Sequence, residues 1–355
     1  MQTIQANNYQ VFFNENGYTY LNTILDPKNY SKIFIIADEN TSNYCLPRFL
    51  SLLTTEIAIE IIELEAGEIH KNIETCLQVW HSLTELGGDR KSIILNVGGG
   101  VITDIGGFIA CTFKRGIDFI NIPTTLLSMV DASIGGKNGV DLGNLKNQIG
   151  IIREPKAVVI DTEYLQTLPG EQMRSGFAEM LKHGLIFDKN YWDKLKNIAD
   201  INTDDLDTLI YQSVVIKNTI VSQDVTENGI RKALNFGHTL GHAIESYCLE
   251  NEEKKSLLHG EAIAIGMILE SYISKEKGLI TPEEHHEIKY VLSDIYDTVS
   301  FDQKDIENCI DLLIYDKKNE FGNIQFALLD KIGNCKINES CDNELIYRAF
   351  ADYNS

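Results

Sequence analysis

The sequence predicts an α/β protein with two domains: an N-terminal domain on a mostly parallel β-sheet, and a mainly α-helical C-terminal domain. The chain has 355 residues, which is more than a usual single domain. Its first half alternates short β-rich runs with amphipathic stretches, the pattern of βαβ units. From about Leu168 onward, long segments have helical periodicity. Pro169 and Gly170 punctuate this change, so we expect domains at 1–168 and 169–355.

The predicted elements are placed by these patterns. The runs predicted as strands are Ile33–Asp38, Ile57–Leu64, Ser92–Val97, Ile117–Ile122 and Ala157–Asp161. The predicted C-terminal helices are Gly170–Phe187, Asp205–Ser222, Lys232–Glu250 and His259–Lys277. A late apolar run, Gln325–Leu329, is too short to assign, although a small strand is one reading. In such α/β domains ligands bind at the carboxyl ends of the strands.

Composition and charge exclude several classes of partner. With 31 basic and 52 acidic residues the formal net charge is -21, which repels nucleic acid and anionic membranes. No apolar run approaches membrane-spanning length, and the N-terminus lacks the pattern of a secretory signal. Seven scattered cysteines without a C-x-x-C pair argue against a disulfide framework or a thiolate zinc site. We therefore expect a cytoplasmic protein.

Two Gly-rich stretches are candidate ligand sites. Gly98 to Asp104 follows a predicted strand and opens a helical stretch, where backbone amides can approach a phosphate. A tight strand-to-helix turn explains the same glycines equally well. The segment from Pro123 to Asn147 is rich in Thr, Gly, Asp and Lys, which favours a ligand-binding loop. A flexible loop is the alternative.

Histidines and a carboxylate suggest a metal site. His238 and His242 are four residues apart and share a helix face, and His259 begins another predicted helix. A catalytic zinc-like ion takes three protein ligands, which two histidines and a carboxylate would supply. Thr239 stands where the H-E-x-x-H motif of metalloproteases needs its general-base Glu, so that activity is disfavoured. A structural histidine pair remains the alternative. Glu179 and Lys182 are three apart on a predicted helix, where an ordinary surface ion pair is the simpler reading.

Taken together, these stretches resemble the 3-dehydroquinate synthases, a sugar phosphate cyclase family distantly related to metal-dependent glycerol dehydrogenases. The resemblance runs from about Ile33 to Lys318. It implies a Rossmann-like N-terminal domain and a helical metal-binding domain. It also implies one divalent metal, zinc or cobalt, with Glu179, His238 and His259 as ligands and His242 as a proton-handling or substrate-ordering group.

The resemblance also assigns a second cofactor, NAD. Positions that match adenosine contacts are Asp38, Asn40, Glu68 and Lys71, and those that match the pyrophosphate turn are Gly99, Gly100, Val101, Ile102, Thr103 and Asp104. Further expected dinucleotide contacts are Thr124, Thr125, Lys137, Lys146, Tyr164, Leu165, Gln166 and Thr167.

Substrate positions follow in the same way. Those that match are Asp131, Lys137, Lys146, Asn147, Lys182, Lys217, Arg231, Asn235, Lys317 and Lys318. Arg115 is expected to come from the neighbouring subunit of a homodimer. The basic residues would neutralise the carboxylate and phosphate of an anionic sugar phosphate inside an acidic protein. Four positions depart from the commonest family pattern, namely Ala66, Asn138, Asp141 and Leu145.

The implied reaction converts 3-deoxy-D-arabino-heptulosonate 7-phosphate to 3-dehydroquinate and phosphate. NAD transiently oxidises the substrate, phosphate is eliminated, the hydride is returned, and an aldol step closes the ring. Another sugar phosphate cyclase is the nearest alternative, and a metal-dependent polyol dehydrogenase that releases NADH is a more distant one. A catalytically inactive NAD-binding or scaffold protein is disfavoured because the expected ligands and lysines are all present.

Overall fold

A computed structural model describes residues 1–143, 145–197, 203–313 and 324–355. The chain divides into two compact units, Met1–Met173 (unit 1) and Arg174–Ser355 (unit 2). The division falls inside helix α6 (Gly170–Phe187), a few residues beyond the boundary expected at Leu168.

Unit 1 is built on a seven-stranded sheet in the order β1-β2-β9-β6-β5-β3-β4. Only β1 and β2 pair antiparallel; every other neighbouring pair is parallel, which confirms the predicted sheet type. The strands are β1 (Ile4–Gln5), β2 (Gln10–Phe13), β3 (Ile33–Asp38), β4 (Ile59–Leu64), β5 (Ile93–Gly98), β6 (Asp118–Pro123) and β9 (Ala157–Ile160).

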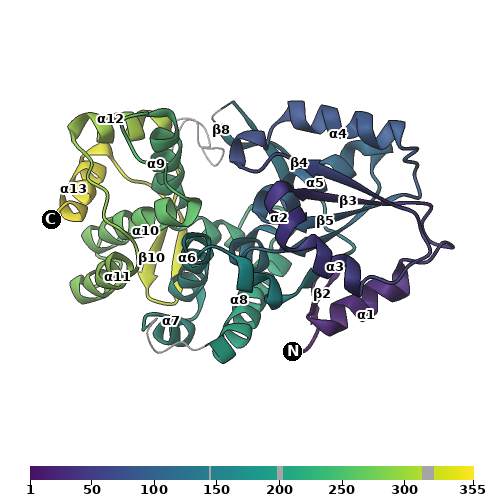
Figure 1. The fold of residues 1–355 in the computed structure, drawn as a ribbon. Helices are drawn as coiled ribbons and strands as arrows, with labels where there is room; N and C mark the ends of the chain where they lie inside the picture. The colour runs from purple at the N-terminus through teal and green to yellow at the C-terminus, as the bar shows by residue number, and fades with distance from the viewer. Residues whose placement is uncertain (144, 198–202, 314–323) are drawn as a thin grey trace. The chain divides into compact units, whose positions relative to one another are not determined.

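Helices cover the sheet of unit 1 (Figure 1). Phe34 and Ile36 of β3 belong to a buried cluster with side chains of α4 and α5. Ile33 and Ile35 point to the opposite face and are also fully buried, as expected for a strand covered on both sides. The helices are α1 (Glu15–Ile24), α2 (Glu39–Tyr44), α3 (Leu46–Leu52), α4 (Ile73–Glu85) and α5 (Gly100–Thr112).

A two-stranded antiparallel ribbon, β7 (Lys137–Leu142) with β8 (Leu145–Ile152), was not predicted. The Thr, Gly, Asp and Lys content of this segment predicts a ligand-binding loop instead. Gly139 and Gly150 face each other in the ribbon, and a Cβ on either would lie 2.7 Å from a backbone oxygen of the other strand. Glycine is therefore required here by close backbone approach and not by loop flexibility.

Unit 2 is mainly helical, as predicted. The remaining helices are α7 (Lys189–Leu195), α8 (Thr203–Gln223), α9 (His238–Glu250), α10 (His259–Glu276), α11 (Pro282–Ile295), α12 (Gln303–Leu312) and α13 (Asn343–Tyr353). The unassigned apolar run forms β10 (Phe326–Lys331), which pairs with β11 (Asn334–Glu339) in a hairpin.

The single helix predicted for Lys232–Glu250 is wrong. The structure has a 3-10 helix, η6 (Ile230–Asn235), and then α9, which begins at His238. Gly237 breaks the helical path with a left-handed backbone of φ 79. Gly266 of α10 packs against it so closely that a Cβ on Gly266 would lie 1.9 Å from the Gly237 carbonyl oxygen. This contact fixes where α9 starts, and so where its histidines point.

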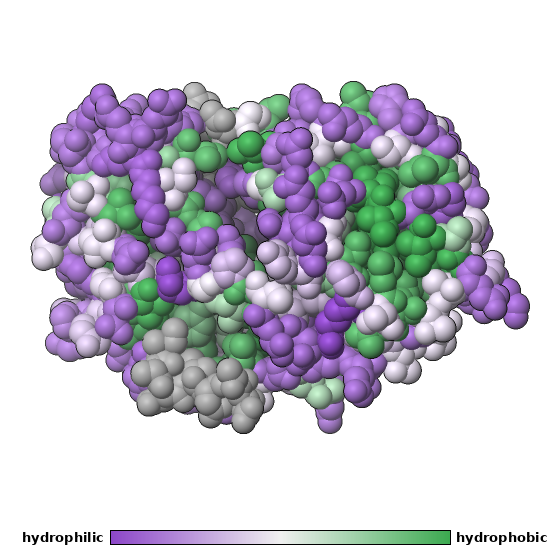
Figure 2. Space-filling model, viewed as in Figure 1, coloured by the Kyte–Doolittle hydropathy of each residue, from purple (hydrophilic) through white to green (hydrophobic). Residues whose placement is uncertain are grey.

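The outside of the molecule agrees with the acidic composition. Figure 2 shows a face that is largely hydrophilic, with hydrophobic side chains gathered on part of unit 1. Among the described residues, no helix has both the length and the apolar character needed to cross a membrane. All seven cysteines lie in the described ranges and are free thiols.

Candidate active-site residues

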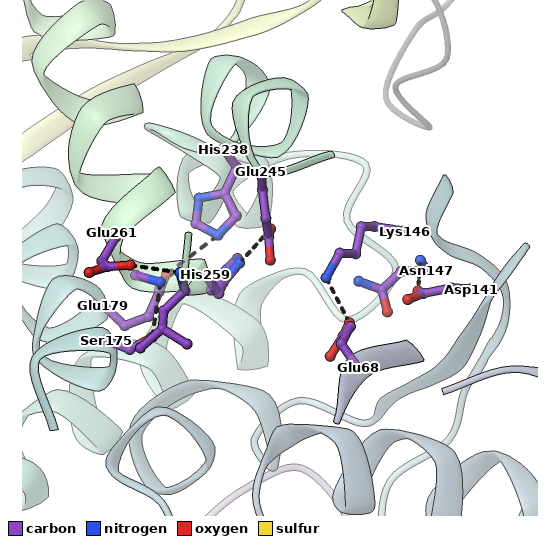
Figure 3. A network of polar contacts seen from close by, with 12 residues as sticks. Glu68, Asp141, Lys146, Asn147, Ser175, Glu179, His238, Glu245, His259 and Glu261 are labelled. Atoms are coloured by element: carbon purple, nitrogen blue, oxygen red, sulfur yellow. Dashed lines mark hydrogen bonds and ion pairs between the residues drawn. The ribbon is translucent and has the colours of Figure 1, made fainter. Parts of the chain in front are cut away.

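Three helices of unit 2 bring the predicted metal ligands together. Glu179 lies in the middle of α6, and its side chain is completely buried. Its Oε1 atom is 3.5 Å from Nε2 of His238 and 3.6 Å from Nε2 of His259. Figure 3 shows both rings pointing toward this carboxylate. One oxygen thus faces two imidazole nitrogens at nearly equal distances.

The other nitrogen of each ring has its own acceptor. Nδ1 of His238 lies 3.1 Å from the Phe236 carbonyl oxygen, and Nδ1 of His259 lies 3.2 Å from Oε2 of Glu245. Burial alone would lower the pKa of His259, but the carboxylates of Glu245 and Glu179 outweigh it and raise the pKa to about 10. Both rings are therefore held with Nε2 directed at Glu179.

His242 lies beside this group. Its ring centroid is 5.1 Å from that of His238 and 5.7 Å from that of His259. Ligand atoms of the three histidines all lie within 4.8 Å of one another, so geometry alone also permits a three-histidine site. His242 is less buried than His238.

The interpretation of Glu179 and Lys182 as a surface ion pair is wrong. Lys182 forms an ion pair with Glu179, and the two side chains are only 1% and 0% exposed. Charged side chains are seldom fully buried unless they are paired, so this buried pair marks a candidate functional site. The apolar neighbours Met180 and Leu181 pack into the core and hold both groups away from water.

The remaining cationic candidates of unit 2 are also buried. Lys217 lies on α8, and Arg231 lies in η6, where its Nη1 donates to the Val225 carbonyl at 2.7 Å. Asn235 donates to Oε1 of Glu227 at 2.8 Å. Lys317 and Lys318 lie outside the described residues.

In unit 1, Lys71 is the centre of a polar cluster. Its buried Nζ lies 2.9 Å from Glu68, 3.5 Å from Asp104 and 3.8 Å from Asp141, and it donates to Asn147 Oδ1 at 3.0 Å. Burial opposes its charge, but these carboxylates raise the pKa of Lys71. Lys146 reaches Glu68 at 3.0 Å, as Figure 3 shows. Lys146 and Asn147 of β8, which are expected to contact the substrate, are thus bonded to Glu68 and Lys71, which are expected to contact adenosine.

The departures Asn138 and Asp141 have structural partners in the same ribbon. Asn138 donates from Nδ2 to the Gly136 and Arg153 carbonyl oxygens, each at 2.8 Å. Asp141 Oδ1 accepts from the Asn147 backbone amide at 2.6 Å. Lys137, half-buried, begins β7.

The Gly-rich turn lies where the pattern predicted it. Strand β5 ends at Gly98, Gly99 is the N-cap, and α5 starts at Gly100. A Cβ on Gly99 would lie 2.9 Å from Cγ2 of Thr125. Thr124 follows β6 and donates from its backbone amide to the Gly98 carbonyl at 3.0 Å, so two strand ends are tied together. A π-helical turn, Ser128–Ala132, follows and carries Asp131.

The other dinucleotide candidates lie at the same carboxyl edge of the sheet. Asp38 ends β3 and caps α2, accepting from the Thr41 amide at 2.8 Å, while Asn40 is exposed on α2. The 3-10 helix Thr162–Thr167 follows β9, and in it Tyr164 and Leu165 are buried whereas Gln166 and Thr167 are exposed. The candidate NAD contacts thus lie where the strands end, which is the edge at which α/β sheets bind ligands.

Arg115 is exposed on a turn between α5 and β6. Lys114, Arg115 and Gly116 have positive φ angles of 51, 70 and 104. Two consecutive non-glycine residues in this region cost free energy, so the turn is held by its surroundings.

Sequence reasoning missed three carboxylates that contact these groups: Glu227, Glu245 and Glu270. Glu245 lies seven residues after His238 on the same helix face, which was the available signal. Glu270 of α10 is fully buried and accepts from the backbone amides of Gly237 and Leu240, at 2.6 and 3.2 Å. No local pattern marked Glu270, because its partners are backbone groups of another helix.

Comparisons with known proteins show which family the chain belongs to. The family models for the N-terminal and C-terminal parts of 3-dehydroquinate synthase match residues 61–175 and 176–319. A 3-dehydroquinate synthase from Parabacteroides distasonis is 42% identical over 94% of this chain and 94% of its own length.

Solved structures show the same fold. A 2-deoxy-scyllo-inosose synthase, complexed with carbaglucose-6-phosphate, NAD+ and Co2+, is 25% identical with a TM-score of 0.84 and covers 99% of both chains. The 2-epi-5-epi-valiolone synthase of Streptomyces hygroscopicus, with NAD+ and Zn2+ bound, is 24% identical with a TM-score of 0.85. It covers 99% of this chain and 98% of its own, and shows the fold alone.

Identity is thus much higher to the 3-dehydroquinate synthase than to the inosose synthase, although the fold is shared with both. The matched residues reach into both units and include Glu179, His238 and His259. This chain belongs to the 3-dehydroquinate synthase family, whose members are lyases.

Proposed function

We propose that the chain converts 3-deoxy-D-arabino-heptulosonate 7-phosphate into 3-dehydroquinate and phosphate, the second step of the shikimate pathway. The observation that carries most weight is the buried Glu179 carboxylate facing Nε2 of His238 and of His259. A buried carboxylate needs a cation beside it, and Lys182 supplies one. Lys182 does not explain why the Nε2 atoms of both imidazoles point at the same carboxylate oxygen.

The distances fit a divalent ion. Two ligand atoms about 2.1 Å from a tetrahedral ion are separated by about 3.4 Å. The observed Oε1 to Nε2 distances are 3.5 and 3.6 Å. Glu179, His238 and His259 would hold zinc or cobalt, and the relative complexed with Co2+ supports this choice. When bound, the metal would polarise the substrate oxygen whose carbon is oxidised.

Unit 1 would hold NAD, as the relative with NAD+ suggests. Gly99 and Gly100 leave the amino end of α5 open to a diphosphate, because side chains there would meet Thr125 or fill the approach. When bound, NAD would supply reversible hydride transfer to and from the substrate carbon. Asp38, Glu68 and the Tyr164 to Thr167 segment would contact the rest of the dinucleotide.

The buried and half-buried cations would bind the substrate's charges. Lys146, Lys182, Lys217 and Arg231 are charged groups inside a protein of net charge -21, and charge-assisted bonds to phosphate and carboxylate are a reason to keep them there. Lys137, Asn147, Asp131 and Asn235 would complete the polar contacts. His242, half-buried beside the proposed ligands, would hold or transfer a proton.

We also propose a homodimer in the cytoplasm, in which Arg115 contributes to the partner's site. The exposed position of Arg115 and the strained turn that presents it support this role.

The test is to supply the heptulosonate phosphate with NAD+ and Co2+ or Zn2+, and to measure phosphate release together with NADH absorbance. We expect phosphate to appear without a stoichiometric rise in NADH, since the hydride is returned. Glu179→Gln, which keeps the side-chain shape but removes the charge, should release almost none. Steady NADH accumulation would instead identify a polyol dehydrogenase, and turnover of a different sugar phosphate alone would identify another cyclase.

A further inference from the structure

Glu245 stands behind the proposed metal site of unit 2. It lies on α9, its side chain is 8% exposed, and its Oε2 is 3.2 Å from Nδ1 of His259. The opposite nitrogen of that ring, Nε2, is 3.6 Å from Glu179 Oε1. The His259 ring therefore bridges two carboxylates, as Figure 3 shows.

The two candidate ligand rings are oriented by acceptors of different charge. His238 has a neutral acceptor for Nδ1, the Phe236 carbonyl oxygen, whereas His259 has the carboxylate of Glu245. A carbonyl fixes the tautomer and the ring plane. A carboxylate does the same and also increases the electron-donating power of the opposite nitrogen.

We propose that Glu245 is a positioning residue for the metal: it holds the proton of His259 on Nδ1 and directs the Nε2 lone pair to the ion. This inference rests on the proposed function, because it needs Glu179, His238 and His259 to be ligands. Glu245 also adds a second buried carboxylate beside Glu179, whose charge is partly neutralised by the Lys182 ammonium.

A purely structural role for Glu245, as a tie between α9 and α10, is the competing explanation. Other contacts also hold these two helices together. The backbones meet at Gly237 and Gly266, where there is no room for a Cβ, and Glu270 of α10 accepts from the amides of Gly237 and Leu240 at the start of α9. Loss of Glu245 should therefore free the His259 ring while the helices stay in place.

The experiment measures the affinity for Zn2+ and Co2+ by competition with a chromophoric chelator, without using activity. Glu245→Ala should bind each ion about 10 to 100-fold more weakly. Glu245→Gln should fall between Ala and the wild type, because its amide oxygen still accepts from Nδ1 but carries no charge. The visible spectrum of bound Co2+ should change in Glu245→Ala.

Glu261→Gln is the matched control. Glu261 is two residues from His259 and accepts from the Leu258 amide at 2.8 Å in a helix cap, so its carboxylate is used by the backbone. It should bind metal like the wild type. Thermal unfolding of the metal-free proteins checks that Glu245→Gln is folded, so that its affinity can be interpreted even if Glu245→Ala is not.

The outcomes separate this inference from the proposed function. If the wild type binds one ion and Glu179→Gln does not, the metal site stands, and unchanged affinity in both Glu245 variants would overturn the inference alone. If Glu261→Gln loses as much affinity as Glu245→Gln, the effect is one of helix stability and the inference fails. A wild type that binds neither ion would overturn both.

Discussion

At the scale of single residues, burial makes Glu179 and His259 depend on their partners. A fully buried carboxylate has no water to solvate it, so its charge must be met by Lys182, by imidazolium or by a metal. In the protein without metal, the carboxylates of Glu245 and Glu179 raise the pKa of His259 and so favour its protonated ring. A metal held by Nε2 would replace the proton on that nitrogen.

The first prediction separates ligands from their neighbours. The affinity of His259→Ala for the metal should be at least an order of magnitude weaker than that of the wild type, because the change removes one of three ligands. His242→Ala should keep its metal but turn over slowly, since His242 is assigned to proton handling. Metal content after gel filtration, measured beside catalytic rate, tests this. Equal metal loss in the two variants would favour the three-histidine arrangement.

Residue types and spacing predicted part of this site. The i, i+4 histidines and His259 at a helix start were visible in the sequence, and so was Glu179 through the family resemblance. The burial of Glu179 and Lys182 was not, because three-residue spacing is the same for a surface pair and a buried one. Glu245 was missed although it continues the helix face of His238 and His242.

At the scale of elements, the start of α9 depends on Glu270. Its two carboxylate oxygens accept from the amides of Gly237 and Leu240, which would otherwise be unsatisfied at a helix amino end. The charge also interacts favourably with the helix dipole. The positions of His238 and His242 follow from this cap.

The second prediction concerns that cap. Glu270→Gln replaces one acceptor with an NH2 group, so one buried amide loses its partner and the free energy of unfolding should fall by about 1 to 3 kcal/mol. Glu276→Gln is the control, because Glu276 makes only partly exposed ion pairs on the same helix, with Lys275 and Arg348. It should change stability by less than about 1 kcal/mol. Urea unfolding measures both, and equal losses would argue against the cap.

Periodicity predicted elements with strong patterns and failed where tertiary contacts decide. Strand β3 was predicted to the residue, because Ile33 to Ala37 is an unbroken apolar run buried on both faces. The ribbon β7–β8 was missed because glycines and lysines hide its alternation. The break at Gly237 was missed because it depends on Gly266, twenty-nine positions further along the chain.

At the scale of the whole molecule, the third prediction tests the shared site. Arg115→Ala and Glu179→Ala should each be inactive alone. In a mixed dimer one site would carry both changes and the other neither, so random reassortment should restore roughly a quarter of wild-type activity. The measurement is phosphate release after subunit exchange, with exchange verified by differently tagged chains. No recovery despite exchange would show that Arg115 acts within its own subunit.

Buried cysteines in each unit allow the local unfolding of that unit to be measured chemically. Cys76 and Cys111 lie in the core of unit 1, where burial raises the pKa of their thiols to about 12 and about 11. Cys248 and Cys309 are buried in unit 2, and burial raises the pKa of both thiols. A thiol-specific reagent reaches such groups only through local unfolding, so the rate of labelling measures the opening of each unit separately.

Added NAD+ should slow the labelling of Cys76 and Cys111, and added zinc should slow that of Cys248 and Cys309, because each ligand stabilises the unit that binds it.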